Sequence, residues 1–186
     1  MGTLIKNAKI VNEGNIIEGD LLIEKELISK VAKNIDGKNH NIIDANECYL
    51  IPGVIDDQVH FREPGLTHKA NIFSESRAAV AGGITSYMEM PNTIPQTLTK
   101  ELLEQKIEIG KNTSLANYSF FFGASNDNLE EVLKIDFKTC PGLKIFMGSS
   151  TGNMLVDDFT TLNNIFSKCE GLIATHCEDE ETIQKN

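Results

Sequence analysis

The sequence has no long apolar run and few basic residues. None of its apolar segments approaches the roughly 18 residues of a membrane-spanning helix. Its first residues, Met-Gly-Thr-Leu-Ile-Lys, lack the basic-then-apolar order of a signal peptide. Seventeen lysines and arginines stand against 27 acidic residues, so the net charge is −10. Because nucleic acids and anionic membranes select basic faces, this balance argues against both as partners.

Cysteine is also sparse and lacks a C-x-x-C pair. The four cysteines, Cys48, Cys140, Cys169 and Cys177, are widely and irregularly spaced. This usage favours a reducing cytoplasm and free, buried thiols. A content of 40% apolar and 24% charged residues is typical of a soluble globular protein. The length suits one ordinary domain, or a small domain with part of a larger one.

Short strand-like runs separated by polar turns fill the first 50 residues. They cover residues 4–11, 16–17, 20–24, 27–31 and 42–45. We therefore expect a small β-rich domain over residues 1–51 and a second domain over 52–186.

After Pro52 the pattern changes to strands alternating with helices. Strand-like runs begin near Val54, Ile84, Ala116, Leu143 and Leu172, at intervals of 30, 32, 27 and 29 residues. Helical patterns cover residues 68–81, 99–111, 128–136 and 157–168. This rhythm predicts βα repeats and a parallel sheet, and both a doubly wound sheet and a (β/α)8 barrel fit it. A full barrel takes about 250 residues, so on the barrel interpretation the five units are a fragment.

Polar residues alternate along the first of these strands. Asp56, Gln58, His60 and Arg62 are expected on one face, because successive side chains of a strand point to opposite sides. Four polar groups on one face of an apolar strand are hard to explain by packing. They indicate a site.

Other strand ends carry further chemistry. Residues 89–93 follow the second strand, Lys144 lies inside the fourth, and His176 ends the fifth. Since carboxyl ends of parallel strands share one rim, His60, Lys144 and His176 suit a metal site. Each also has an ordinary alternative. Either histidine could be a core residue, and Lys144 could extend to solvent from a strand edge.

Arg62 and the glycine-rich segment at residues 148–152 are also open to more than one interpretation. The Arg62 guanidinium suits a carboxylate, or a structural pair with Glu63 or Asp57. Residues 148–152 are rich in glycine and serine but lack the spacing of a phosphate-binding loop. We predict a mobile loop over the site there.

Two motifs connect the chain to a known family. Residues 52–56 with His60-Phe61-Arg62-Glu63-Pro64-Gly65, and Met90-Pro91-Asn92-Thr93, resemble the dihydroorotases of the amidohydrolase superfamily. The resemblance extends over essentially the whole chain. It implies a TIM-type (β/α)8 barrel whose first part is residues 52–186, flanked by a partial β-sandwich at 1–51.

The resemblance also implies a role for each residue of the site. His60 matches a zinc ligand of the family's D-x-H-x-H-x-R pattern, and His176 matches a ligand of a second zinc. Lys144 matches the bridging lysine, which is carboxylated in one branch of the family. The resemblance also assigns a catalytic role to Lys144 and to Asp56, which would lie beside the metal ligands. Arg62 and Asn92 match the pair that holds the substrate carboxylate.

The chain departs from the family pattern in two respects. Gln58 stands where the first histidine is usual, and its neutral amide is a weaker zinc ligand, so one metal site should be depleted. The strand-six histidine and the strand-eight aspartate, the family's general base, would lie beyond Asn186. We therefore expect the 186 residues alone to be inactive.

These resemblances imply a cytoplasmic hydrolase of pyrimidine biosynthesis, which cyclises N-carbamoyl-L-aspartate reversibly to dihydroorotate. A homo-oligomer is expected, with association with aspartate transcarbamoylase as a further possibility. One alternative is another cyclic amidase, allantoinase or dihydropyrimidinase, although these lack the arginine and asparagine combination. The other is a non-catalytic scaffold related to dihydroorotase, which Gln58 favours.

Overall fold

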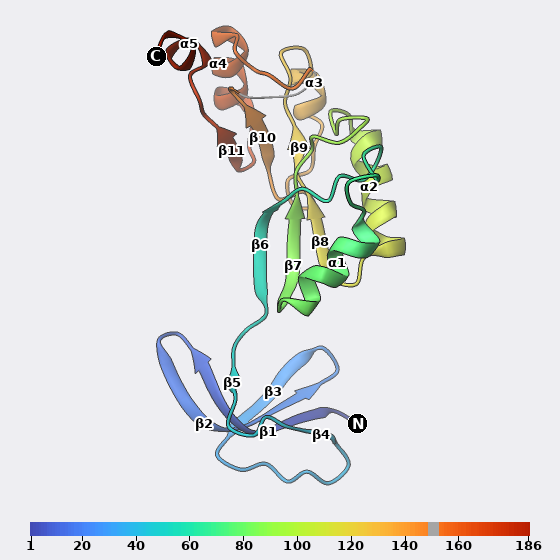
Figure 1. Ribbon diagram of the computed structural model, residues 1–186, viewed down its shortest axis with the longest axis vertical. Helices are drawn as coiled ribbons and strands as arrows, with labels where there is room; N and C mark the ends of the chain where they lie inside the picture. The colour runs from blue at the N-terminus through green and yellow to red at the C-terminus, as the bar shows by residue number, and fades with distance from the viewer. Residues whose placement is uncertain (149–152) are drawn as a thin grey trace. The chain divides into compact units, whose positions relative to one another are not determined.

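A computed structural model describes residues 1–148 and 153–186, without the side chains of residues 180, 181 and 184. The chain forms two compact units, Met1–Gly53 and Val54–Asn186 (Figure 1). Most of the loop predicted at residues 148–152 lies outside the described residues.

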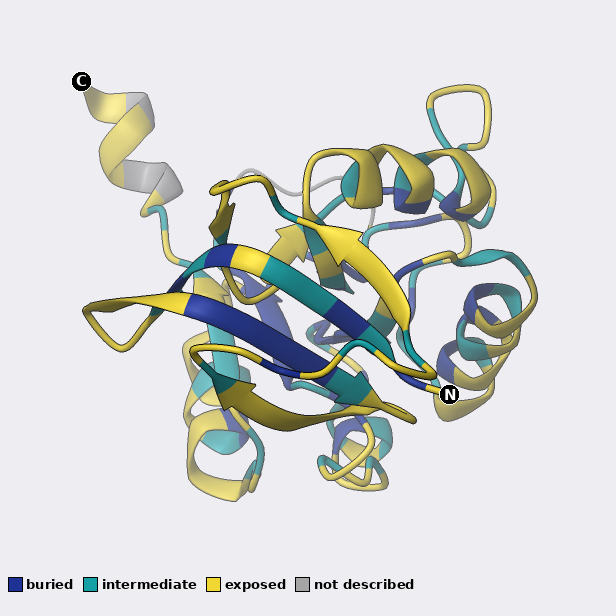
Figure 2. Ribbon diagram, turned by 90° about the horizontal axis from the view of Figure 1, so that it is seen from below, coloured by how far each residue is buried: buried dark blue, intermediate teal, exposed yellow. Residues whose placement is uncertain are grey.

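The first unit is one five-stranded sheet. Its strands are β1 (Thr3–Asn12), β2 (Asn15–Glu24), β3 (Leu27–Ala32), β4 (Asn41–Asp44) and β5 (Tyr49–Leu50). Strands β1, β2 and β3 form an antiparallel meander, while β4 and β5 both pair with β1 in parallel. Burial is concentrated on β1 and β2, and the outer strands β3 and β4 are largely exposed (Figure 2).

A buried carboxylate organises the polar part of this sheet. Asp20 on β2 accepts hydrogen bonds from the backbone N–H groups of Asn7 (3.1 Å) and Ile35 (2.9 Å). The ammonium of Lys6 lies 3.6 Å from the same carboxylate. Asn7 has a left-handed backbone conformation, with φ of 54°. The carboxylate therefore fixes a bend in β1 where the register with β2 shifts.

The second unit alternates strands with helices. Its strands are β6 (Val54–Val59), β7 (Ile84–Glu89), β8 (Asn117–Phe120), β9 (Phe122–Gly123), β10 (Leu143–Phe146) and β11 (Ile173–His176). Its helices are α1 (Ile72–Ala81), α2 (Lys100–Thr113), α3 (Leu129–Val132), α4 (Phe159–Lys168) and α5 (Glu180–Lys185). The strands are parallel and form two sheets, ordered β6-β7-β8 and β9-β10-β11 (Figure 1).

The predicted rhythm is confirmed by this arrangement. Each of the five expected strands begins within one residue of its predicted start. The third strand is divided by Phe121 into β8, which pairs with β7, and β9, which pairs with β10. The mixed α/β class is therefore correct, with five consecutive parallel strand positions in sequence order.

Helix starts follow local capping. The Thr99 side chain accepts the Leu102 N–H, as expected for the start of α2. Helix α1 begins at Ile72, later than residue 68, because the Asn71 side chain caps it there. Helix α3 is limited to four residues, Leu129–Val132, whereas the pattern predicted residues 128–136.

Alternation along β10 separates its two faces. Leu143 and Ile145 belong to the main apolar core, which also contains residues of α1, α3 and α4. Lys144 and Phe146 lie on the opposite face, where the Lys144 ammonium is 5.1 Å from the Phe146 ring centroid. The strand thus carries a buried lysine on the side away from the core.

All four cysteines are free, as predicted, but their expected burial is wrong for two of them. Cys140 is buried, whereas Cys48 and Cys177 are exposed. No helix in the described ranges is long and apolar enough to cross a membrane.

Candidate active site at the strand ends

The segment after β6 leaves the strand earlier than the sequence predicts. The expected common face of Asp56, Gln58, His60 and Arg62 is wrong for its last two members, because β6 ends at Val59. The register with β7 also shifts between Asp56 and Val59. Arg62 then adopts a left-handed backbone conformation with φ of 70°, which is unfavourable for a residue with a Cβ. His60 and Arg62 therefore belong to the loop between β6 and α1.

His60 is held by the residue predicted to bind substrate. Its Nδ1 lies 2.9 Å from Oδ1 of Asn92, in the loop after β7. Since an amide oxygen only accepts, Nδ1 carries the hydrogen and Nε2 keeps its lone pair. Burial, followed by the charge of Arg62, lowers the pKa of His60 despite the bond to Asn92. The ring is therefore neutral near pH 7, as a metal ligand requires.

Lys144 is buried without a counter-charge. Only 3% of the surface of Lys144 is exposed. Within the described residues it has no ion pair with an acidic side chain. Burial lowers the pKa of its ammonium, with a smaller opposing effect from Cys177. This burial contradicts the alternative in which Lys144 extends to solvent from a strand edge, and it disfavours the ammonium form.

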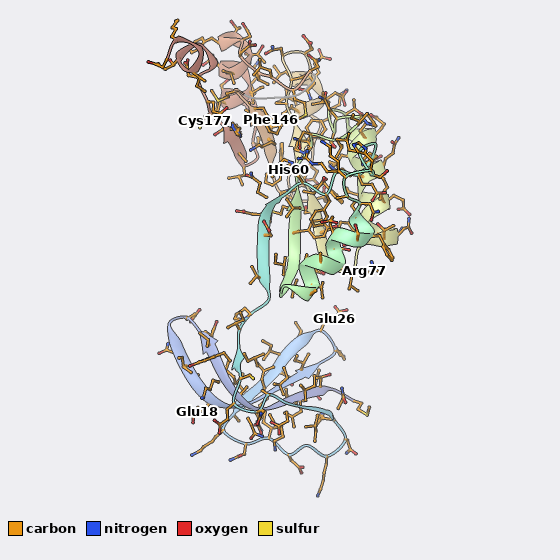
Figure 3. The ribbon with its side chains drawn as sticks, in the orientation of Figure 1. Glu18, Glu26, His60, Arg77, Phe146 and Cys177 are labelled. Atoms are coloured by element: carbon orange, nitrogen blue, oxygen red, sulfur yellow. The ribbon has the colours of Figure 1, made fainter. Side chains whose placement is uncertain are left out.

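His176 is oriented by its own strand end. Its Nε2 lies 3.0 Å from Oε1 of Glu178, and its ring stacks on Phe146 at 6.2 Å between centroids. Phe146 is also its register partner across β10 and β11. Phe146 and Cys177 mark these strand ends in Figure 3, and His60 marks the end of β6. His176 and Lys144 therefore both lie beside the Phe146 ring, and Nε2 of His176 is directed to Glu178.

Asp56 and Gln58 are less closely connected to this group. Oδ1 of Asp56 accepts the Gln58 backbone N–H at 3.2 Å, and Gln58 is exposed. In the described part of the chain, no hydrogen bond joins Gln58 to His60 or Lys144, and no group of three His, Cys, Asp or Glu residues is arranged to hold a metal.

The two loops that carry Arg62 and Asn92 pack directly on each other. The Ile94 N–H donates to the Pro64 oxygen at 3.1 Å. Gly65 has φ of 82°, and a Cβ there would stand 1.9 Å from the Ile94 oxygen. Only glycine permits this approach. The sequence motif His60–Gly65 thus ends in a residue required by the packing of the neighbouring loop.

Sequence reasoning missed a buried ion pair beneath these loops. Glu89, the last residue of β7, pairs with Lys106 of α2, and each is 1% exposed. Nζ of Lys106 also donates to the Met90 oxygen at 2.9 Å. A signal was present, since Lys106 follows Leu103 by three residues and precedes Gly110 by four. Both are on the buried face of α2.

Comparisons with known proteins assign the chain to a family. The family model described as "Dihydro-orotase-like" matches residues 48–183. The chain belongs to this family. A dihydroorotase of Methanosarcina mazei is 34% identical over 182 residues, covering 95% of this chain and 40% of that protein. One of Bacillus cytotoxicus is 34% identical over 191 residues, covering all of this chain and 44% of that protein.

Solved structures of the wider group have the same fold. An L-hydantoinase (dihydropyrimidinase) from Arthrobacter aurescens superposes with a TM-score of 0.91 at 28% identity, covering 98% of this chain and 42% of that one. The resemblance inferred from the two motifs is thus confirmed for the dihydro-orotase-like family. The chain spans about two fifths of the length of the curated relatives it matches.

Proposed function

We propose that this protein acts as a dihydroorotase and interconverts N-carbamoyl-L-aspartate and dihydroorotate. The observation that carries the proposal is the 2.9 Å contact between His60 and Asn92. It unites a histidine suited to metal with an amide suited to a substrate carboxylate, in a chain of the dihydro-orotase-like family.

Arg62 and Asn92 would both bind the substrate carboxylate, each through different donor groups. The Arg62 guanidinium offers a planar pair of donors that matches a carboxylate. Oδ1 of Asn92 is occupied by His60, which leaves its Nδ2 hydrogens for the substrate. One amide would therefore orient the histidine and the substrate together, so that the ring amide lies over the metal-binding side of His60.

The residues fit one zinc ion better than two. His60 has a free Nε2, and Lys144, once carboxylated, becomes an anionic oxygen donor whose burial is no longer opposed by an ammonium charge. His176 would complete the set by turning from Glu178, whereas exposed Gln58 offers only a weak neutral oxygen. The chemistry that zinc supplies when bound is polarisation of the ring carbonyl and a more acidic water. Asp56 accepts the Gln58 backbone N–H and so fixes the peptide that precedes His60 by two residues.

The remaining parts of the proposal follow from the family resemblance. They are a (β/α)8 barrel that begins near residue 52, a partial β-sandwich at 1–51, and a place in cytoplasmic pyrimidine biosynthesis. They also include a homo-oligomer and association with aspartate transcarbamoylase. The five sequential parallel strands support the barrel, because this order is that of a barrel's first five units.

The test uses the polypeptide that carries this chain, at its natural length, with dihydroorotate, hydantoin and allantoin assayed side by side. We expect dihydroorotate to be preferred, and Arg62→Met to lower kcat/KM for it by about 100-fold. Arg77→Met is the matched control, since the Arg77 guanidinium stacks on Phe73 of its own helix α1 at 3.6 Å. Figure 3 marks Arg77 on this helix. Preference for hydantoin or allantoin would contradict the proposal.

A non-catalytic scaffold is the second candidate, because Gln58 replaces a strong ligand with a weak one. Metal analysis of the same polypeptide separates the two functions. A zinc content near one per chain with turnover supports the enzyme. A metal-free protein without turnover, even after incubation with zinc and bicarbonate, supports the scaffold.

A further inference from the structure

The buried pair of Glu89 and Lys106 lies where the two substrate-binding loops begin. Glu89 ends β7, and Lys106 comes from the middle of α2. Both side chains are 1% exposed, and the Lys106 ammonium also lies 5.4 Å from the Phe120 ring centroid. Burying two charges offers little net stability compared with an apolar pair of the same size. Stability alone therefore does not explain why two charged side chains are buried at this position.

Glu89 holds the loop that carries Arg62. The backbone N–H groups of Arg62 and Phe61 face its carboxylate and oppose the rise that burial causes in the Glu89 pKa. Arg62 is the residue with φ of 70°, and Phe61 packs on Tyr87 of β7 with ring centroids 4.5 Å apart. An apolar side chain at position 89 would remove the negative charge that both N–H groups face. The carboxylate thus fixes a backbone conformation that a residue with a Cβ resists.

Lys106 holds the loop that carries Asn92. Its Nζ donates to the Met90 oxygen at 2.9 Å, two residues before Asn92. The Met90 N–H in turn donates to the Val59 oxygen at 3.0 Å, so Met90 is hydrogen-bonded both to α2 and to β6. A single ammonium therefore contacts Glu89 on one side and the start of the Asn92 loop on the other.

We propose that Glu89 and Lys106 are positioning residues that set the backbone of Arg62 relative to Asn92, and so the width of the site for the substrate carboxylate. Neither residue touches the substrate. The ligand class rests on the proposed function, but the positioning of the Arg62 peptide by the pair stands on the contacts above.

Amide hydrogen exchange tests the positioning without any assay of activity. In the full polypeptide, Glu89→Met with Lys106→Met removes both charges at similar volume. We expect exchange at Phe61 and Arg62 to rise at least tenfold. The Ile72 N–H is the internal control, because Glu63 of the same loop accepts it at 2.8 Å. Unchanged exchange at residues 61 and 62, or an equal rise at Ile72, would overturn the proposal.

A second variant covers the case in which the double variant does not fold. Glu89→Gln keeps the shape and one acceptor oxygen, and we expect a rise of threefold or more at the same two amides. The exposed pair on the same helix, Glu108 with Lys111, supplies the matched control in Glu108→Met with Lys111→Met. Equal exchange in Glu89→Gln and in the parent protein would likewise overturn the positioning.

Kinetics then connect the pair to the ligand. We expect the variant that folds to raise KM for dihydroorotate about tenfold while kcat changes less than threefold, because only the carboxylate contacts loosen. A fall in kcat at constant KM would contradict a role through Arg62. A parent protein that neither binds nor converts dihydroorotate would reject the proposed function, and the exchange experiment would still decide the positioning.

Discussion

Asp20 in the first unit and Glu89 in the second occupy similar local settings. Each is a buried carboxylate that faces two backbone N–H groups, one of them from a residue with a left-handed conformation, Asn7 or Arg62. Asp20 accepts a hydrogen bond from both of its N–H groups. Each also has a lysine partner. The two units thus use one arrangement to hold an unfavourable backbone bend.

The partners differ, and so does the electrostatic outcome. Lys6 is about a third exposed, at 31%, whereas Lys106 is 1% exposed. Burial raises the pKa of Asp20, but the hydrogen bonds and Lys6 outweigh it, and the pKa falls below its usual value. For Glu89, burial dominates and raises the pKa, while burial lowers that of Lys106. The charged form of Asp20 is therefore favoured, with a lysine partner that is partly exposed. The charged forms of Glu89 and Lys106 are disfavoured, because both side chains are buried.

The largest expected difference between the two units comes from replacing the lysine of each pair. Lys106→Met leaves the Glu89 carboxylate buried and unpaired, so we expect a loss of about 3–5 kcal/mol in the free energy of unfolding. Lys6→Met should cost less than about 1 kcal/mol, because solvent screens this pair. Urea titrations of both variants measure the difference. Equal losses would mean that burial of the cation does not distinguish the two pairs.

An intermediate effect is expected from acid. The pKa of Asp20 lies below its ordinary value of 3.8 in the folded protein. Its contribution is therefore complete above that value and is lost as pH falls through the folded pKa. We expect Asp20→Asn to cost about 1–3 kcal/mol at pH 7 and to flatten the decline of stability below about pH 4. Unfolding measured from pH 7 to pH 2 tests this, and an unaltered acid decline would contradict it.

The smallest effect concerns the bends themselves. Arg62→Gly relieves a left-handed conformation but adds freedom to the unfolded chain, so we expect a net gain of about 0.5–1 kcal/mol. Asn tolerates this conformation, and Asn7→Gly should change stability by less than about 0.5 kcal/mol. Thermal unfolding of the two variants provides the comparison. A loss of stability in Arg62→Gly would show that the arginine side chain itself supports the fold.

Much of the second unit could be predicted because its signals are local. The five strand starts follow apolar runs, and Thr99 marks the start of α2 by a hydrogen bond within one turn. The site was harder, because its geometry depends on contacts distant in sequence. Alternation placed Arg62 on the face of Asp56, whereas Arg62 has φ of 70° and its N–H faces a carboxylate on the next strand.

The buried pair shows the same limit. A lysine in a helix is usually on the solvent-facing side. Only the position of Lys106 between Leu103 and Gly110 indicates that it lies on the buried face of α2. Its partner is 17 residues earlier, on a strand, so no helical spacing connects them. Motif comparison identified His60 and Asn92 but not their direct contact, which depends on how two loops meet.

The interruption at Phe121 has a consequence for how the chain folds. Among the residues that the structure describes, strands β6, β7 and β8 pair only with one another. Their connections each span about 30 residues, and the entropic cost of closing such loops grows slowly with length. The residues before the interruption include Arg62, Asn92 and the Glu89–Lys106 pair. We therefore expect the part of the unit that carries Arg62 and Asn92 to assemble early during synthesis, before β10 and β11 add Lys144 and His176.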